Sequence, residues 1–552
     1  MKKLGMVPVI LSIAVIAIAC SDNSSSTPDN TTEGVDVSSI DGTTIEPTDK
    51  FSYSASSAID QLSATTSNFF IAPAPSASAN ISKNSTKQTY TADDCIEGNA
   101  QPSTVSFPQD DEMMDTLGST IPNGDWLACI KVLPLEEGST ESAVYSFTVA
   151  GGSNPSFSGT LDTIFGGGEG FASLDFTAFD GFDGNQIRID SSGNIYFGAY
   201  GYNDVEDEDD PEDGHFYMWK MDPLGNADDS FGTDSNGLVD VPYPGGSMGM
   251  FWVFNDASIL LVAEGPVDDA NSAIRMVKLT ESGAIDSSFG TSGVVEYNTF
   301  DTSEPAAVVA DSDGYIYVVG VSYESGEVYS VATIWKFDSS GSIVSDFATD
   351  GALRWNDLHA THQSEAVGIE ILSDGSILVT GWAKEGWDGL PYTYLWKFDS
   401  DGNMISSFGE GGMVETGIQL EPLPITVDAD GYIYIGGTPD DESDDSDGYL
   451  YKFNSDGTQN STFSTYTRDG TFFGSQITIL NSTLFYAGEE GESGIVAGID
   501  SSSGSSVTDL FTDGFYSITG YLPENVVQDS IGRLVVGAIK SDMSGLRVYR
   551  FR

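Results

Sequence analysis

Short apolar runs alternate with polar clusters from about residue 160 to the C-terminus. In residues 305–355 the runs PAAVVA, YIYVVG, ATIWKF and GALRW are separated by DSDG, by a longer polar segment and by a stretch that begins DSSG. Apolar runs of this length between Asp, Ser and Gly turns are typical of β-strands. The inner runs are apolar at nearly every position, so we expect four-stranded sheets packed on both faces.

The same pattern recurs along the chain. DSDGYIYVVG, starting at Asp311, and DADGYIYIGG, starting at Asp428, are identical at seven of ten positions. A basic third-strand signature (YMWKMD, TIWKFD, YLWKFD, RVYRFR) follows each copy, and a phenylalanine signature (LDTIFGG, DSSFGT, ISSFGE) comes next. A period of 48 to 66 residues predicts an all-β, seven-bladed β-propeller with four-stranded blades. The repeated phenylalanines are Phe165, Phe231, Phe289, Phe347, Phe408, Phe463 and Phe511.

The phase of the repeats predicts how the ring closes. The chain enters this region on the phenylalanine signature LDTIFGG and ends on the third-strand signature RVYRFR. Seven complete blades therefore require FASLDF (171–176) to supply the outermost strand of the blade that the C-terminus forms. Such a clasp also covers a strand edge that could otherwise pair with another chain.

The residues before the propeller divide into three parts. Residues 1–19 form a signal with Lys2, Lys3 and a short apolar run, and AIAC resembles the lipobox of bacterial lipoproteins, with Cys20 as the lipidated residue. An ordinary secretory signal followed by a coincidental cysteine is the alternative. Ser21 replaces the aspartate that often retains lipoproteins at the inner membrane, so the resemblance implies the bacterial outer membrane. Residues 20–50 indicate a disordered Ser/Thr-rich tether, and 51–159 a small β-rich region.

Charge and cysteine content limit the partners. The chain has 21 Lys plus Arg against 84 Asp plus Glu, a formal net charge of −63. Such a surface repels phosphate backbones, which excludes nucleic acid as a ready partner. After Cys20 only Cys95 and Cys129 remain, and an oxidising exported location favours a disulfide between them.

The repeats also carry a family resemblance. LDTIFGGG, DSSFGTSGVV, SDGSILVTG and WKFDSDGNMISSFGEGGMV resemble the delta-60 family of bacterial β-propeller repeats, and DSDGYIYV is similar to the turns of NHL-type propellers. The resemblance covers about 390 of the 552 residues. It implies the propeller at 160–552 and little about function, because propellers serve in binding, scaffolding and catalysis.

Six basic residues recur at one third-strand position. They could form a basic binding ring, but pairing with turn aspartates and packing along blade faces is the favoured interpretation. The residues are Lys220, Lys278, Lys336, Lys397, Lys452 and Arg550.

Candidate chemistry is concentrated in long loops. GxSxG, HExxH and GxxxxGK motifs are absent from the sequence, so no catalytic residue is assigned. His359, His362 and Glu365 could supply metal ligands. The connections from second to third strand and from fourth strand to the next blade share one rim, which is acidic and predicts a ligand surface. Its candidate ligand residues are Tyr323, His359, His362, Trp387 and Tyr392.

Two of these loops could bind calcium weakly. Dense carboxylates repel one another unless a cation neutralises them, and Ca²⁺ accepts flexible oxygen ligands. No cofactor is required, and solvated loops are the alternative. The carboxylates are Asp204, Glu206, Asp207, Asp209, Asp210 and Asp213 in one loop, and Asp440, Asp441, Asp444, Asp445 and Asp447 in the other.

The sequence favours a lipid-anchored propeller that binds a protein or carbohydrate at the cell envelope, without enzymatic activity. A carbohydrate-active lyase or hydrolase using rim carboxylates is the first alternative. A structural component of an envelope assembly is the second. Carboxylates gathered at the mouth of the ring beside an aromatic residue would favour the enzyme. Carboxylates spread around the rim would favour a protein that only binds a partner.

Overall fold

The computed structural model describes the backbone of strands within residues 36–149 and most of residues 157–552. The longest gaps in the second part are 176–180, 203–213, 242–249, 356–361 and 439–446. The chain divides into two compact units, one with the N-terminal strands and one with the repeats. All regular elements among the described residues are strands, apart from a short 3-10 turn at Gly166–Gly168.

The N-terminal unit contains two sheets. The strands predicted around WLACIKV and SAVYSFTV are confirmed as β6 and β7, while β1 and β2 lie within residues 20–50. The first sheet has the order β1 (Asp36–Val37), β3 (Lys50–Ser54), β5 (Glu112–Thr116). The second has the order β2 (Thr43–Ile45), β7 (Glu141–Val149), β6 (Gly124–Val132), β4 (Ser67–Pro73).

The repeats form seven four-stranded antiparallel blades, as predicted. Blade 1 is β9 (Gly181–Ile189), β10 (Ile195–Tyr202), β11 (Gly214–Met221) and β12 (Leu238–Val241). Blade 2 is β13 (Met250–Val253), β14 (Ile259–Asp268), β15 (Asn271–Leu279) and β16 (Val294–Tyr297). Blade 3 is β17 (Thr302–Ala310), β18 (Ile316–Tyr323), β19 (Val331–Phe337) and β20 (Ala352–Arg354). Blade 4 is β21 (His362–Ile371), β22 (Ile377–Glu385), β23 (Tyr392–Phe398) and β24 (Met413–Glu415).

The remaining blades complete the ring. Blade 5 is β25 (Glu421–Val427), β26 (Ile433–Thr438), β27 (Gly448–Phe453) and β28 (Tyr466–Arg468). Blade 6 is β29 (Thr471–Leu480), β30 (Thr483–Glu490), β31 (Ser493–Asp500) and β32 (Phe515–Thr519). Blade 7 is β33 (Tyr521–Gln528), β34 (Leu534–Lys540), β35 (Gly545–Phe551) and β8 (Phe171–Asp175).

The predicted clasp is confirmed in blade 7. Strand β8 pairs antiparallel with β35, with Leu174 opposite Leu546 and Phe171 opposite Tyr549. The guanidinium carbon of Arg547 lies 4.1 Å from the Phe171 ring centroid and 4.0 Å from that of Tyr521. The first and last segments of the repeat region are therefore joined by both hydrogen bonds and side-chain packing.

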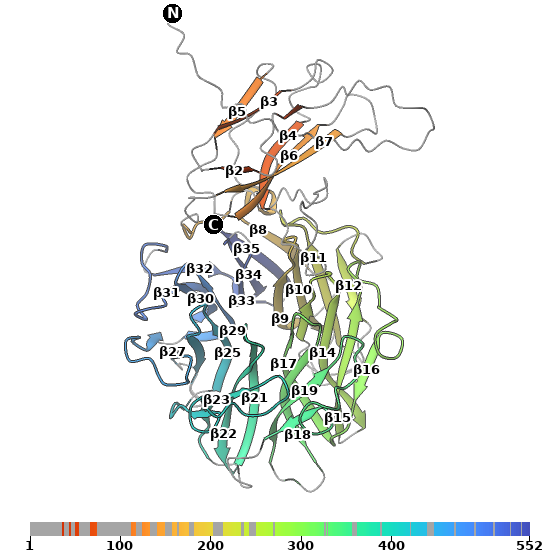
Figure 1. Cartoon of the computed structure of the whole chain (residues 1–552), viewed down its shortest axis with the longest axis vertical. Coiled ribbons are helices and arrows are strands. Elements are labelled where there is room, and N and C mark those ends of the chain that lie inside the picture. Colours follow the sequence, from red (N-terminus) through yellow and green to blue (C-terminus); the bar gives the residue numbers. More distant parts are fainter. Residues whose placement is uncertain are drawn as a thin grey trace, which may run out of the picture. The chain divides into compact units, whose positions relative to one another are not determined.

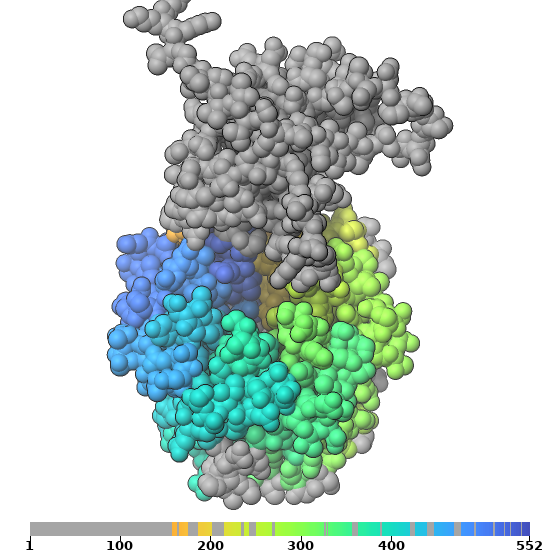
Figure 2. All heavy atoms as spheres, viewed as in Figure 1, coloured from red at the N-terminus to blue at the C-terminus, as the bar shows by residue number. Residues whose placement is uncertain are grey.

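The first strand of each blade lies innermost. Neighbouring first strands contact one another around the ring, and β9, β17, β21, β25, β29 and β33 are labelled around the centre of the repeat unit in Figure 1. Figure 2 shows the blades following one another in sequence order, from yellow-green through cyan to blue. The seven repeated phenylalanines are all buried between blades. Their burial explains the phenylalanine signature, since each ring contributes about 2 kcal/mol when it leaves water.

Turn chemistry explains the polar clusters. The Asp311 carboxylate accepts the backbone N–H groups of Asp313 and Tyr315, which caps the tight turn between β17 and β18. Blade 6 lacks this motif, and Asn481 and Ser482 instead have φ values of 49° and 63°. Two successive positive φ values form the two-residue hairpin turn that suits twisted strands. Blade 6 is therefore complete despite its divergent sequence.

Candidate functional site

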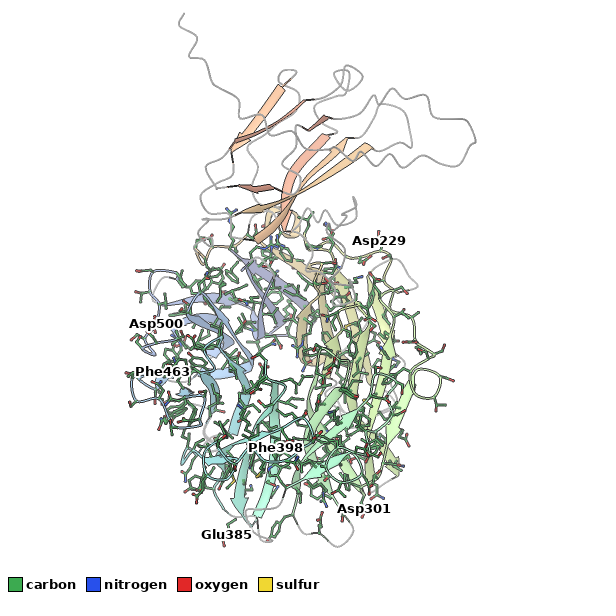
Figure 3. All side chains as sticks on the ribbon, viewed as in Figure 1. Asp229, Asp301, Glu385, Phe398, Phe463 and Asp500 are labelled. Atoms are coloured by element: carbon green, nitrogen blue, oxygen red, sulfur yellow. The ribbon has the colours of Figure 1, made fainter. Side chains whose placement is uncertain are left out.

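The connections of the propeller separate onto two faces. We name the end where first strands begin the long-loop face, and the end with the turns between first and second strands the tight-turn face. Asp301, just before β17, and Glu385, at the end of β22, belong to the long-loop face and lie at the same edge of the molecule in Figure 3.

Acidic residues recur at one register position near the long-loop face. Glu304 pairs with Val321, and Glu365 pairs with Trp382. Val321 lies four residues after Tyr317 on β18, and Trp382 lies four residues after the equivalent Leu378 on β22. The corresponding backbone positions in blades 5 and 1 are Glu421, paired with Thr438, and Asp183, paired with Tyr200. Acidic residues thus occupy matching positions on innermost strands of four blades.

Three glutamates and one tyrosine of this layer are linked by their charges. Burial raises the pKa of the Glu304 carboxyl, and the Glu264 carboxylate on β14 raises it further. Burial also raises the pKa of the Tyr323 hydroxyl, and the carboxylates of Glu304, Glu365 and Glu264 add to this shift. Blades 2, 3 and 4 therefore each supply one carboxylate whose charge acts on the Tyr323 hydroxyl, and we name these four residues the acidic site.

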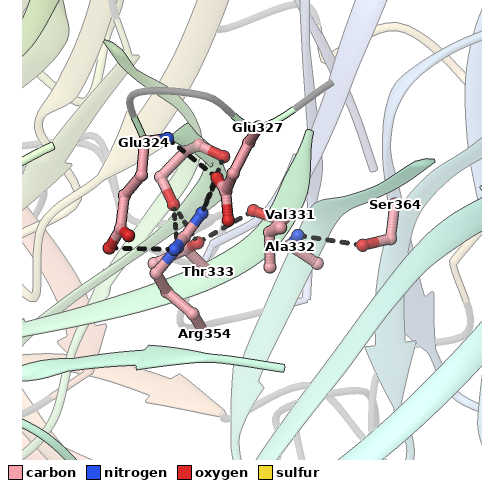
Figure 4. A network of polar contacts seen from close by, with 8 residues as sticks. Glu324, Glu327, Val331, Ala332, Thr333, Arg354 and Ser364 are labelled. Atoms are coloured by element: carbon pink, nitrogen blue, oxygen red, sulfur yellow. Dashed lines mark hydrogen bonds and ion pairs between the residues drawn. The ribbon is translucent and has the colours of Figure 1, made fainter. Parts of the chain in front are cut away.

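A polar network holds the segment that follows Tyr323 (Figure 4). Arg354, on the outermost strand of blade 3, contacts Glu324 Oε1 at 3.0 Å and Glu327 Oε2 at 2.5 Å. Its Nε donates to Ser322 Oγ at 2.8 Å. These contacts fix residues on both sides of Tyr323, so the tyrosine occupies a defined place on the face.

Ser364 joins blade 4 to blade 3 beside the acidic site. Its buried Oγ accepts the Ala332 N–H at 3.0 Å, and its own N–H donates to the Ser330 carbonyl at 3.1 Å. Because Glu365 is the next residue, these two hydrogen bonds set the position of its backbone relative to Tyr323.

An aromatic side chain borders the site. Trp382 is the cross-strand partner of Glu365, which places the two side chains on the same face of blade 4. The Lys384 ammonium lies 5.4 Å from the Trp382 ring centroid. The arrangement offers carboxylates, a phenol and a partly exposed indole to a ligand.

The predicted rim residues have different outcomes. Tyr323 is part of the acidic site, whereas the Tyr392 hydroxyl accepts a hydrogen bond from Gln419 Nε2 at 2.9 Å. The side chains of His359, His362 and Trp387 lie outside the described residues. Neither Glu264 nor Glu304 was predicted from the sequence, and Glu365 was predicted only as a metal ligand. A signal was available, since Glu-Pro occurs at 304–305 and 117 residues later at 421–422, before apolar strands.

The predicted metal and cysteine residues are largely outside the described residues. Asp447 is the described member of the two acidic loops, and the calcium site stays a prediction. Within the described part of the chain, no group of three or more His, Cys, Asp or Glu residues could hold a metal ion. The side chains of Cys20, Cys95 and Cys129 are not among those described, so the lipid anchor and the disulfide also stay predictions.

The repeated third-strand cations pack within and between blades. Lys220 pairs with Asp228 at 3.0 Å, as the sequence suggested for the whole set. Lys336 and Lys452 instead donate to turn carbonyls of the next blade, at 3.0 and 2.8 Å, and lie over tyrosine rings. These contacts support a packing role and not a basic binding ring.

Two segments of this chain match a known family model. The match is to the domain of unknown function (DUF5122) beta-propeller, over residues 372–408 and 429–463. Both segments run from the turn before a second strand to the phenylalanine signature, in blades 4 and 5. No curated protein matches the chain.

Several solved structures are similar to this chain at low sequence identity. A PL25 ulvan lyase, a polysaccharide lyase, is 12% identical with a TM-score of 0.41, over 69% of this chain and 96% of the lyase. A protein of unknown function from Dyadobacter fermentans is 10% identical with a TM-score of 0.37, over 70% of this chain and all of that one. An α-L-arabinanase from Penicillium chrysogenum is 10% identical with a TM-score of 0.35, over 69% and 98%.

Among the described residues, no helix has the length and apolar character that a membrane span requires.

Proposed function

We propose that this protein is an exported, lipid-anchored binding protein of the bacterial outer membrane, and that its ligand is a positively charged segment of a protein partner. The observation that carries the proposal is the combined effect of the Glu264, Glu304 and Glu365 charges on the pKa of Tyr323 at the long-loop face. The carboxylates come from three blades, so the fold itself gathers them.

Electrostatics favour a cationic ligand. Burial and the Glu264 charge both disfavour ionised Glu304, and an ammonium or guanidinium group placed there would reverse that effect. Tyr323 and Trp382 offer ring faces that attract cations. The net charge of −63 draws basic ligands toward the surface from a distance.

The test is calorimetric binding of a trilysine peptide to the full chain and to single-charge variants. Glu304→Gln and Glu365→Gln should each weaken binding about tenfold, since each removes a carboxylate from the acidic site. Glu281→Gln is the matched control, because it removes one charge from an exposed turn on the tight-turn face. Equal weakening by all three variants would show that only the overall charge attracts the peptide, and would refute the site.

A carbohydrate-active enzyme is a second candidate, favoured by one observation. Glu304 has a raised pKa and shares Tyr323 with a second carboxylate, Glu365. Glycoside hydrolysis uses such a pair, with the higher-pKa carboxyl as the proton donor. Release of reducing ends from an anionic or neutral polysaccharide, lost in Glu304→Gln, would support this function over binding alone.

A further inference from the structure

We propose that a cavity on the tight-turn face, between blades 4 and 5, binds a small zwitterion with an apolar side chain, such as a free α-amino acid. Its volume is about 410 Å³, within the range of small-molecule sites. It lies at the opposite end of the strands from the acidic site and is independent of it. The lining residues that matter are Glu370, Asp374, Leu378, Lys397, Asp428 and Ser455.

The cavity has a cause in the repeat pattern. In blade 3 the Tyr317 hydroxyl donates to Asp311 at 3.2 Å, and the Tyr317 ring lies opposite Lys336 in the sheet. Blade 4 has Leu372 at the aspartate position and Leu378 at the tyrosine position. A leucine fills less space than a tyrosine, and both leucines line the cavity. The missing ring and carboxylate therefore leave room for a ligand.

Lys397 differs from its counterparts in the neighbouring blades. The Lys336 ammonium donates to the Ser400 carbonyl and lies 4.6 Å from the Tyr315 ring centroid. The Lys452 ammonium donates to the Ser501 carbonyl in the same way. Among the described residues, the Lys397 ammonium makes neither a hydrogen bond nor a ring contact, although its side chain is half-buried and its charge helps to lower the pKa of the Asp374 carboxyl. A ligand carboxylate would supply the missing acceptor.

The Asp374 carboxylate could bind the positively charged end of the ligand. Asp374 Oδ1 accepts the backbone N–H and the hydroxyl of Ser376, at 2.9 and 2.5 Å. Hydrogen bonds from Ser376 lower the pKa of the Asp374 carboxyl, so it is ionised at neutral pH. Within the described part of the chain its Oδ2 has no hydrogen bond. A ligand ammonium fits this oxygen, with Glu370 further along the wall.

Charge and surface together select a zwitterion. A simple anion would face the carboxylates of Asp374 and Asp428, and a simple cation would face Lys397. A molecule with both charges satisfies both. Leu372 and Val427 line the cavity and are partly exposed, so an aliphatic side chain would pack against them.

The first experiment compares three probes on the full chain by calorimetry. L-leucine carries both charges, 4-methylpentanoate lacks the ammonium, and 3-methylbutylamine lacks the carboxylate. We expect leucine to bind and each analogue to bind at least about tenfold more weakly. Absence of leucine binding, or equal binding of all three, would overturn the proposal.

The second experiment locates the binding. Lys397→Met should weaken leucine binding at least about tenfold, whereas Lys336→Met, the same change in blade 3, should leave it unchanged. The double variant Leu372→Asp with Leu378→Tyr rebuilds the aspartate–tyrosine pair of blade 3 and should abolish binding while thermal stability is kept. Leucine binding that survives both cavity variants would overturn the proposal. Glu304→Gln should not affect leucine binding, so this test and that of the acidic site can fail separately.

Discussion

The carboxylate of Asp162 accepts a hydrogen bond of 2.8 Å from Nε of Arg550, which lies 388 residues later in the chain. Both side chains are almost completely buried. The same Asp162 oxygen lies 3.4 Å from Nη1 of Arg533, whose Nε bonds Asp529 at 2.6 Å. The entry to the repeat region and its end therefore meet in one buried ionic cluster, next to the clasp.

Loss of Asp162 should destabilise the ring strongly. Asp162→Ala leaves Arg550 buried without its carboxylate, and breaking one side of a buried pair costs about 3–5 kcal/mol. Urea denaturation followed by tryptophan fluorescence measures the effect. Glu281→Ala is the control, since this side chain is exposed and its loss should barely move the midpoint. If the urea midpoint of Asp162→Ala shifted no more than that of the control, a structural role for the cluster would be contradicted.

Deletion of residues 171–177 should cost far more than deletion of residues 21–30. Without β8, the edge of β35 loses its hydrogen-bonded partner, and exposed strand edges promote association. We expect a lower melting temperature and higher oligomers in size-exclusion chromatography. The tether deletion should change neither. Equal behaviour of the two deletions would show that β8 does not close the ring in solution.

Most of the fold could be predicted because the geometry of a propeller blade depends on residues that are close together in the sequence. The Asp311 turn, the buried Phe347 and the Lys336 strand each recur in register, and the phase of the repeats determined that β8 must pair with β35. These features depend on short-range periodicity and on ring closure, both of which are visible in a sequence.

The acidic site was less predictable, because it depends on how neighbouring blades meet. Tyr323 was identified from its loop, but Glu264 and Glu304 lie inside strands, where acidic residues resemble ordinary solvent-facing positions. Their proximity depends on blade-to-blade contact and on the innermost position of β17 and β21. The cavity between blades 4 and 5 was not predicted because it depends on a departure from the repeat. Leu378 stands there at the position that Tyr317 occupies in blade 3.

Cys20→Ala should release the protein from membranes. If Cys20 carries the lipid, the alanine variant lacks the acyl chains that hold it to the bilayer. Fractionation of expressing cells should move the protein from the membrane pellet to the soluble exported fraction. Ser21→Ala is the control and should stay in the pellet. Retention of the Cys20→Ala variant in the membrane would indicate an attachment other than lipid at this residue.

Glu370→Gln should stabilise the protein at alkaline pH and not at acidic pH. Burial raises the pKa of the Glu370 carboxyl from its ordinary value to about 7, although the Arg188 guanidinium on the innermost strand of blade 1 opposes the shift. Since the pKa in the folded state exceeds the unfolded value, folding favours the protonated form. Glu370 thus contributes stability below about pH 4.5 that is lost as the pH rises through about 7.

The comparison is the free energy of unfolding of the wild type and of Glu370→Gln between pH 4.5 and 8.5. A neutral glutamine imitates the protonated acid, so the two proteins should agree near pH 4.5 and the variant should be more stable by up to about 3 kcal/mol at pH 8. Glu281→Gln, at an exposed turn, should show no such pH-dependent difference. A variant that is instead less stable at pH 8 would mean that attraction to Arg188 outweighs burial, and that the carboxylate is ionised in the folded protein at neutral pH.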